Sequence, residues 1–320
     1  MRTGRPARPT LQFPPHVIDY HRELLADERR TNAFREAVAR VVRPGDVVVD
    51  VGCGSGILSF FACEAGAARV YAIDQTHAAD VASLLARHVG LSDRITVLHG
   101  EAKTIELPER ANVLLSETLG VAGLDEGIAE IVADARNRFL APGARIVPRR
   151  VGVWIVPVEL DAEYDKHVAF WNGTRYGIDL RPLRLFASSS ILFAHIQPTA
   201  YVDAPREALS VDLTHDDAKN AAGRVSFEAT RDARLHGFGV FFTATLADGI
   251  ELTNREARST SWSQAFLPLE VPIALERGAR IDVELQCDRG RSWRWRGEAN
   301  GEAFDQMTWL AMPPCERGSS

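Results

Sequence analysis

The chain has 320 residues, of which 46% are hydrophobic and 25% charged, a composition typical of a globular protein. A net charge of −6 argues against a nucleic-acid binder that depends on a broad basic face, so we expect no nucleic-acid partner. No apolar run approaches the length of about 18 residues that a membrane-spanning helix needs, so we expect no membrane partner. The four cysteines lack the spacing of a zinc site or disulfide framework, which predicts no metal and a cytoplasmic location.

The N-terminal part of the chain divides into a leader and a helical segment. Residues 1–16 are basic and proline-rich without an apolar core, which predicts a flexible leader and not a secretory signal. From Val17 to Val41 the apolar residues recur at helical spacing. Only 3 of the 37 basic residues are lysines, a bias typical of a GC-rich bacterial genome.

Two domains with different patterns follow. Continuous apolar runs alternate with amphipathic helical stretches up to residue 148, and we expect strands at 47–52, 68–74, 95–100, 112–117 and 145–148. This alternation predicts a doubly wound, Rossmann-like α/β domain over residues 17–148. Residues 149–320 contain short β-rich runs separated by Gly and Pro, which predict an antiparallel β-barrel or sandwich domain. The stretch at about 163–190 fits neither pattern and is expected to be an inserted arm.

A glycine loop in the segment VVVDVGCGSG (47–56) carries the first functional signal. Gly52, Gly54 and Gly56 follow a buried strand and open a helix, so that a ligand can approach the backbone and the helix N-terminus. Asp74 ends the second strand, 22 residues after Gly52, where it can accept hydrogen bonds from ribose hydroxyls. The Gly-x-Gly-x-Gly spacing favours S-adenosylmethionine, with a nicotinamide dinucleotide as the alternative at this point.

A pair of glutamates follows the fourth strand in the segment SETLGVAGLDE. Glu117 lies at the carboxyl end of the strand, and Glu126 lies where the next helix begins. Each alone is more simply a surface residue or an acid that complements a helix N-terminus. Because a loop with Gly120 and Gly123 joins them, the two together predict a carboxylate clamp for a guanidinium or another cationic nitrogen.

These segments together resemble the protein arginine methyltransferases over nearly the whole chain. The resemblance implies S-adenosylmethionine as cofactor and Glu117 and Glu126 as catalytic residues that hold the substrate guanidinium. The segment HRELLADERRT (21–31) is similar to the helix with which the family covers the cofactor, which implies that His21 lies near the ribose and that Arg30 pairs with the methionine carboxylate. The other cofactor-binding residues implied by the resemblance are Asp50, Gly52, Gly54, Asp74, Glu101 and Ala102.

The chain also departs from the family pattern. LQFPPHVIDY stands where the family has a tyrosine-containing helix, and Lys103 stands where it has a glutamate for the adenine, so that Glu101 is expected to substitute. Ser261 replaces the histidine of the family's Thr-His-Trp loop. We expect Asp27, Ser261 and Trp262 on the substrate side, with proton release to water or to a glutamate.

The remaining motifs bear on assembly and substrate. FWNGTRYGIDLR resembles part of the family's dimerisation arm, which implies a homodimer through the region of Trp171 and Tyr176. Trp293 and Trp295 are expected in the core, and RGRSWRWRGE (289–298) is expected to be an exposed hairpin. We predict N-methylation of an arginine guanidino nitrogen, with free arginine or a small arginine-like molecule favoured over protein arginine. The alternatives are a natural-product O-, N- or C-methyltransferase and a catalytically weak dimeric scaffold.

Overall fold

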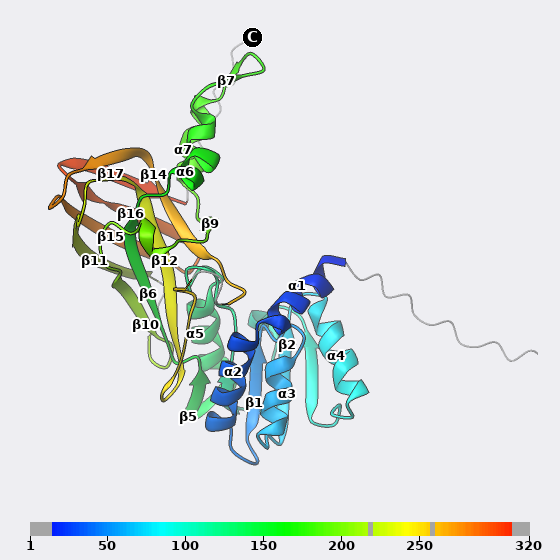
Figure 1. The fold of residues 1–320 in the computed structure, drawn as a ribbon. Helices are drawn as coiled ribbons and strands as arrows, with labels where there is room; N and C mark the ends of the chain where they lie inside the picture. Colours follow the sequence, from blue (N-terminus) through cyan, green and yellow to red (C-terminus); the bar gives the residue numbers. More distant parts are fainter. Residues whose placement is uncertain (1–14, 217–219, 257–259, 309–320) are drawn as a thin grey trace, which may run out of the picture.

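The computed structural model describes residues 15–216, 220–256 and 260–308, which form a parallel-sheet domain and a β domain with a projecting arm (Figure 1). Most of the predicted leader lies outside the described residues. Within the described ranges, no helix combines the length and apolar character needed to cross a membrane. Nor do these ranges contain a group of three or more His, Cys, Asp or Glu side chains placed to hold a metal ion.

A parallel five-stranded sheet in the order β3-β2-β1-β4-β5 forms the centre of the first domain. The three central strands β2, β1 and β4 are largely buried and apolar because helices cover both faces of the sheet. The reversal of strand order between β1 and β4 creates a crevice at their carboxyl ends, where ligands bind in open α/β sheets. The strands are β1 (Val47–Val51), β2 (Arg69–Asp74), β3 (Ile95–His99), β4 (Ala111–Leu115) and β5 (Leu140–Val147).

The helices of this domain follow the predicted alternation, with one difference at the N-terminus. The expected single helix is divided at Asp27 into α1 (Pro15–Ala26) and α2 (Glu28–Val41). The Asp27 carboxylate accepts a hydrogen bond from the Arg30 backbone N–H at 2.9 Å, which caps α2. The other helices are α3 (Ile57–Glu64), α4 (Ala78–His88), the 3-10 turn η1 (Ala102–Thr104) and α5 (Ile128–Phe139).

Two antiparallel sheets form the β domain and confirm the predicted fold class. One contains β10-β6-β12-β14-β9 with β13 beside β12, and the other contains β11-β15-β16-β17. The fully buried Trp293 and Trp295 are core residues of the second sheet, as expected. The strands are β6 (Arg150–Val158), β9 (Leu192–Ala194), β10 (Arg206–Asp212), β11 (Asn220–Glu228), β12 (Ala233–Ala247), β13 (Ile250–Thr253), β14 (Gln264–Leu275), β15 (Arg280–Asp288), β16 (Ser292–Ala299) and β17 (Glu302–Met307).

The arm extends away from both sheets in Figure 1 and exposes apolar side chains. Tyr176 at its tip is fully exposed, and Ile178 is 62% exposed. A large apolar surface on a thin projection is typical of a region that another chain covers. The arm and the connection that follows it contain α6 (Asp161–His167), η2 (Ala169–Trp171), β7 (Thr174–Arg175), β8 (Ile178–Asp179), η3 (Arg181–Leu183), α7 (Arg184–Ser188) and η4 (Pro198–Ala200).

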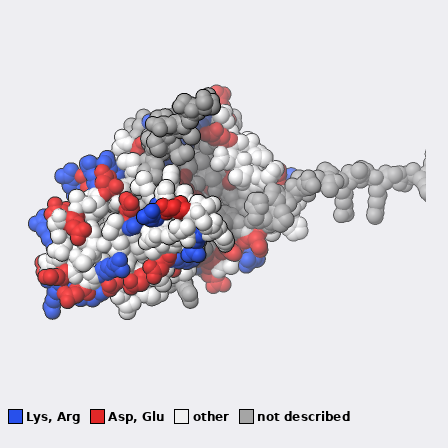
Figure 2. All heavy atoms as spheres, turned by 90° about the horizontal axis from the view of Figure 1, so that it is seen from above, with Lys and Arg blue, Asp and Glu red and all other residues white. Residues whose placement is uncertain are grey.

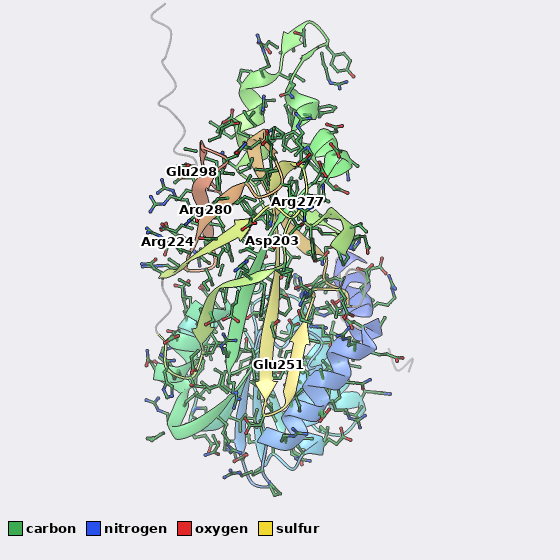
Figure 3. The ribbon with its side chains drawn as sticks, turned by 60° about the vertical axis from the view of Figure 1, so that its left-hand side comes forward. Asp203, Arg224, Glu251, Arg277, Arg280 and Glu298 are labelled. Carbon is green, nitrogen blue, oxygen red and sulfur yellow. The ribbon has the colours of Figure 1, made fainter. Side chains whose placement is uncertain are left out.

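Charged side chains of both signs are interspersed on the surface. The face in Figure 2 shows acidic and basic residues alternating, without one sign covering it. The β domain illustrates the pattern: Arg280 pairs with Asp282 at 2.7 Å, and Arg224 pairs with Glu284 at 2.7 Å. Figure 3 shows Arg224 and Arg280 projecting from this sheet. Ion pairs at the surface, which solvent screens, contribute little to stability.

Candidate active site

A pocket of about 870 Å³ lies beyond the carboxyl ends of the parallel strands and reaches the β domain. The glycine loop, Asp74 and the loop after β4 contribute to its walls, and α1 and α2 cover it. Of the residues predicted from sequence, those that line it are His21, Arg30, Gly52, Gly54, Asp74, Glu101, Ala102, Glu117, Glu126 and Trp262. The fold therefore gathers residues separated by up to 241 positions at one site.

The glycine loop and Asp74 hold each other in place. Asp74 accepts a hydrogen bond from the Gly54 backbone N–H at 2.9 Å and from the N–H and hydroxyl of Thr76 at 2.8 and 2.6 Å. Oδ1 accepts both bonds from Thr76, whereas Oδ2 accepts only the one from Gly54 and retains acceptor capacity for a ligand hydroxyl. Gly54 has φ = +54°, and a Cβ there would lie 2.8 Å from the His21 ring, so a larger residue would be strained and would displace that ring.

His21 thus packs directly on the glycine loop. Burial of the ring between α1 and the glycine loop lowers the pKa of its imidazole, with Asp74 opposing that effect and Arg30 adding to it. A neutral ring presents both a donor and an acceptor to the pocket.

Asp50 occupies a different place from the one expected. It is fully buried behind the loop and does not line the pocket. One carboxylate oxygen accepts a hydrogen bond from the Ser59 hydroxyl at 2.7 Å, and the other has no partner among the described residues. Burial raises the pKa of Asp50 to about 7, against the effect of the Ser59 hydrogen bond. Asp50 therefore ties β1 to α3 and supports the loop from behind.

Arg30 lines the pocket from the first turn of α2. Its guanidinium pairs with Glu117, donates to the Leu24 carbonyl at 3.1 Å and stacks 5.3 Å from the Trp262 ring centre. Its Nε is buried and has no hydrogen-bond partner among the described residues. Burial lowers the pKa of Arg30, although Asp27 and Tyr20 oppose this effect. The site therefore holds a desolvated cation with unused donor capacity.

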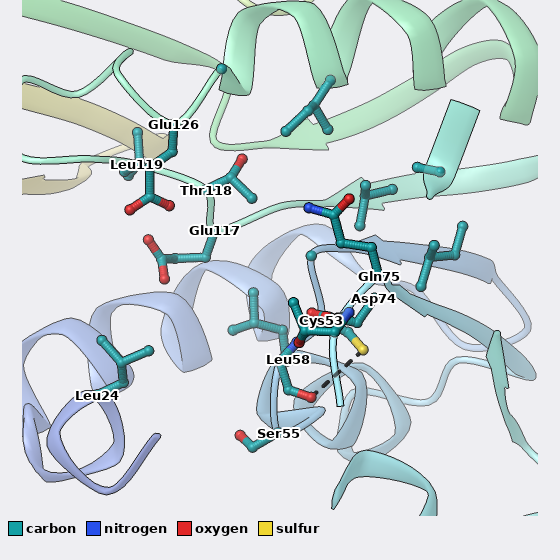
Figure 4. Close-up of a pocket in the computed structure, with 18 of the residues that line it drawn as sticks. Leu24, Cys53, Ser55, Leu58, Asp74, Gln75, Glu117, Thr118, Leu119 and Glu126 are labelled. Carbon is teal, nitrogen blue, oxygen red and sulfur yellow. Dashed lines mark hydrogen bonds between the residues drawn. The ribbon is translucent and has the colours of Figure 1, made fainter. Parts of the chain in front are cut away.

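Glu117 and Glu126 approach one another from the two ends of the loop after β4, as Figure 4 shows. The Glu117 side chain is 13% exposed and engages Arg30. Glu126 opens into the pocket, and the protein around it raises its pKa through desolvation and through the neighbouring Asp125, with Arg30 acting in the opposite direction. Two carboxylates around one cavity can bind the planar fork of a guanidinium with several hydrogen bonds.

The loop that carries the two glutamates is built from two successive turns. The Gly123 N–H donates to the Gly120 carbonyl at 3.0 Å, and the Gly127 N–H donates to the Leu124 carbonyl at 2.9 Å. Asp125 accepts hydrogen bonds from the backbone N–H groups of Val121 and Ala122 at 3.1 and 2.8 Å, which closes the first turn onto the second. Glu126 is consequently a central residue of a closed turn and not the end of a free strand.

Asp27, Ser261 and Trp262 connect the two domains at the pocket. The Asp27 carboxylate caps α2 with one oxygen and accepts a hydrogen bond from the Ser261 backbone N–H with the other. Trp262 donates from its indole N–H to the Leu119 carbonyl at 2.9 Å. Trp262 lines the pocket, whereas Asp27 and Ser261 lie behind its wall, so their contacts are structural.

The comparisons with known proteins agree with this geometry. Residues 149–299 match the family model described as the arginine methyltransferase oligomerization subdomain, and residues 30–144 match that of the ribosomal protein L11 methyltransferase. The chain is 31% identical over 283 residues to protein arginine N-methyltransferase 6 of Xenopus laevis, covering 84% of this chain and 83% of the relative. It is 32% identical over 278 residues to protein arginine N-methyltransferase 1 of Dictyostelium discoideum, with 83% and 81% covered.

The chain belongs to the protein arginine methyltransferase family. It is therefore an S-adenosylmethionine-dependent methyltransferase.

Two solved structures share the fold of this chain. The Trypanosoma brucei PRMT1 enzyme-prozyme complex with AdoHcy has a TM-score of 0.80 at 25% identity, covering 90% of this chain and 96% of that one. Arabidopsis thaliana protein arginine methyltransferase 10 shares the fold, with a TM-score of 0.76 at 23% identity over 91% of this chain and 98% of that one.

The residues of this arginine methyltransferase fit the cofactor of the family. The unpaired Nε–H of Arg30 can donate to a carboxylate, and Oδ2 of Asp74 can accept a hydrogen bond from a ribose hydroxyl. Glu101 is exposed at the other end of the pocket, beside the half-buried Ala102. Lys103 pairs with Glu130 of α5 at 3.0 Å. Glu130 also lines the pocket, although the sequence patterns did not indicate it.

Sequence patterns also missed Tyr20 and Asp125. Tyr20 lines the pocket, and its pKa is raised by burial and by Glu126 while Arg30 lowers it, so its phenol shares the electrostatic environment of the carboxylate clamp. Its position directly before His21 was the available signal. Asp125 directly precedes Glu126, but its role depends on the turn that folds it back onto Val121 and Ala122.

Proposed function

We propose that this methyltransferase N-methylates the guanidino group of arginine within a peptide or protein. The observation that carries the proposal is the Glu117–Glu126 pair, which faces a pocket containing the glycine loop and Asp74. The curated relatives are named for protein arginine, which favours a polypeptide substrate. The expectation of free arginine depends on the altered segment LQFPPHVIDY and on Ser261 in place of the histidine, and it has no support from the relatives.

The residues of the pocket account for the chemistry. When bound, S-adenosylmethionine supplies an electrophilic methyl group on a sulfonium sulfur. Glu126 and the Glu117 oxygen that does not pair with Arg30 orient the guanidinium. The Glu126 charge offsets that of the guanidinium, and the two carboxylates draw positive charge toward the nitrogens they contact, which leaves lone-pair character on the remaining nitrogen. Glu126 lines the pocket and desolvation raises its pKa, so its carboxylate is suited to accept the departing proton.

The experiment that tests this proposal is a methyl-transfer assay with labelled cofactor. Three acceptors are compared at equal arginine concentration: free arginine, an arginine-containing peptide, and the same peptide with lysine in place of arginine. We expect label in the arginine peptide, and mass spectrometry should place it on the guanidino group. Turnover of free arginine alone would establish the small-molecule preference, and no turnover of any guanidino compound would refute arginine methylation.

We also propose that the chain forms a homodimer through its arm. Residues 149–299 match an oligomerization subdomain, and the arm exposes Tyr176 and Ile178. We expect the double change Tyr176→Asp, Ile178→Asp to convert a dimer into a monomer in light scattering, because two charges would have to be buried at the contact. Val271→Asp, at an exposed apolar position on β14 outside the arm, is the matched control and should leave the mass unchanged. A dimeric double variant would refute this contact.

A further inference from the structure

The arginine-rich motif of the β domain reaches the active site through the turn between β15 and β16. The turn comprises residues 288–291, and the Arg291 N–H donates to the Asp288 carbonyl at 2.9 Å. Arg291 lines the pocket, with its guanidinium 3.8 Å from Glu130 of α5. The segment predicted to be an exposed hairpin therefore has its tip at the site, whereas its two tryptophans lie in the core.

Gly290 makes the closest approach. Its φ is +72°, and a Cβ placed there would lie 2.2 Å from the Leu124 carbonyl oxygen and 2.7 Å from the Gly127 Cα. Both neighbours are backbone atoms, which cannot move aside as the end of a flexible side chain can. No residue with a side chain fits this position without displacing either the hairpin tip or the segment from Leu124 to Gly127.

That segment carries one of the two glutamates of the clamp. The hydrogen bond from the Gly127 N–H to the Leu124 carbonyl closes the turn whose central residues are Asp125 and Glu126. Gly290 packs against both ends of this same hydrogen bond. The Arg289 carbonyl oxygen lies 3.8 Å from where a Cβ of Gly127 would be, so the tip also contacts the start of α5.

We propose that Gly290 is a positioning residue for Glu126. The turn between β15 and β16 packs against the 124–127 turn from the β domain and holds the Glu126 carboxylate at the place where it meets the substrate guanidinium. This inference rests on the proposed role of Glu126. A displacement of about 1 Å at a group that orients a reacting atom lowers the rate by about a hundredfold.

The chain offers a matched pair of glycines for the test. Gly301 lies in the neighbouring turn between β16 and β17 with φ = +81°, and nothing lies within 4 Å of the Cβ it would acquire. Gly290→Ala and Gly301→Ala therefore introduce similar backbone strain, but only Gly290→Ala pushes against the turn that holds Glu126. We expect Gly290→Ala to lower kcat/KM for the arginine peptide by about tenfold to a hundredfold, with the Kd for S-adenosylhomocysteine unchanged and Gly301→Ala active.

Hydrogen exchange provides a second measurement that needs no substrate. In Gly290→Ala the amide of Gly127 and the segment 121–131 should exchange faster than in Gly301→Ala, because the hydrogen bond that closes the turn is strained. If the unaltered protein methylates no guanidino compound, the proposed function fails, and the exchange rates still decide whether Gly290 holds the turn. Equal kinetics and equal exchange in the two variants would overturn the proposal.

A second variant covers the case in which Gly290→Ala does not fold. Asparagine adopts a positive φ at lower cost than alanine, so Gly290→Asn keeps the steric conflict and reduces the strain. The same loss of kcat/KM and faster exchange are expected. If both Gly290 variants failed to fold while Gly301→Ala folded, the contact would be needed for folding. That result would overturn a specific role in positioning.

Discussion

Replacing Glu126 by glutamine is expected to lower kcat/KM for an arginine peptide by about a thousandfold, while the affinity for S-adenosylhomocysteine stays the same. The change keeps the size and acceptor oxygen of the side chain but removes the charge that orients and neutralises the guanidinium. Removal of one preorganised electrostatic contact from an active site typically costs about 10² to 10³ in rate. Initial-rate measurements with labelled cofactor, together with calorimetric titration of S-adenosylhomocysteine, separate the two effects.

Glu117→Gln should differ from Glu126→Gln in stability. Glu117 pairs with Arg30, and both side chains are more than four-fifths buried, so that loss of the negative charge leaves a desolvated cation without its partner. We expect the same loss of activity and in addition about 1–3 kcal/mol less unfolding free energy. Glu64→Gln, at an exposed ion pair with Arg35, is the control and should be active and stable. Normal turnover by both clamp variants would eliminate the carboxylate clamp.

Arg30→Ala is expected to weaken S-adenosylhomocysteine binding by about tenfold to a hundredfold, which corresponds to the 1.5–3 kcal/mol of a hydrogen bond to a charged group. The buried guanidinium has an unpartnered Nε that faces no other acceptor among the described residues. 5′-Methylthioadenosine lacks the amino-acid carboxylate of the cofactor. Its affinity should therefore be the same in Arg30→Ala and in the unaltered protein, and titration of both ligands measures the contribution of the carboxylate alone.

Arg35→Ala is the matched control for this comparison. It removes an arginine from the same helix, but from an exposed pair with Glu64 outside the pocket. Both ligands should bind to it normally. If Arg30→Ala weakened the two ligands equally, Arg30 would act by holding α2 over the pocket through its contacts with Leu24 and Trp262, and the carboxylate assignment would be wrong.

The sequence alone predicted much of the fold and the main chemistry of the pocket. Apolar runs separated by amphipathic helices indicate a parallel sheet because covering helices bury both of its faces. The spacing of Gly52, Gly54 and Asp74 is local to one β-α-β unit, so it can be read from one stretch of chain. The two glutamates are likewise separated by a single loop, and the structure places both in the pocket.

Contacts between distant segments could not be predicted in this way. Asp50 lies near the end of β1, where a cofactor-binding residue is expected. Its carboxylate instead accepts a hydrogen bond from the Ser59 hydroxyl behind the glycine loop. The division of the first helix depends on Asp27, whose second oxygen meets Ser261 from the other domain. Arg30 and Glu117 neutralise each other across 87 positions of sequence.

The turn between β15 and β16 shows most clearly what the sequence pattern predicts and what only the tertiary structure shows. The alternation in RGRSWRWRGE determines a strand with buried tryptophans, because successive side chains point to opposite faces of a sheet. This two-residue alternation does not predict that Gly290 packs against the backbone of Leu124 and Gly127. Sequence pattern determined the elements and the types of residue in the pocket. Only the tertiary structure decided which charges neutralise one another and which backbone segment holds Glu126, because those contacts arise when the β domain packs on the sheet.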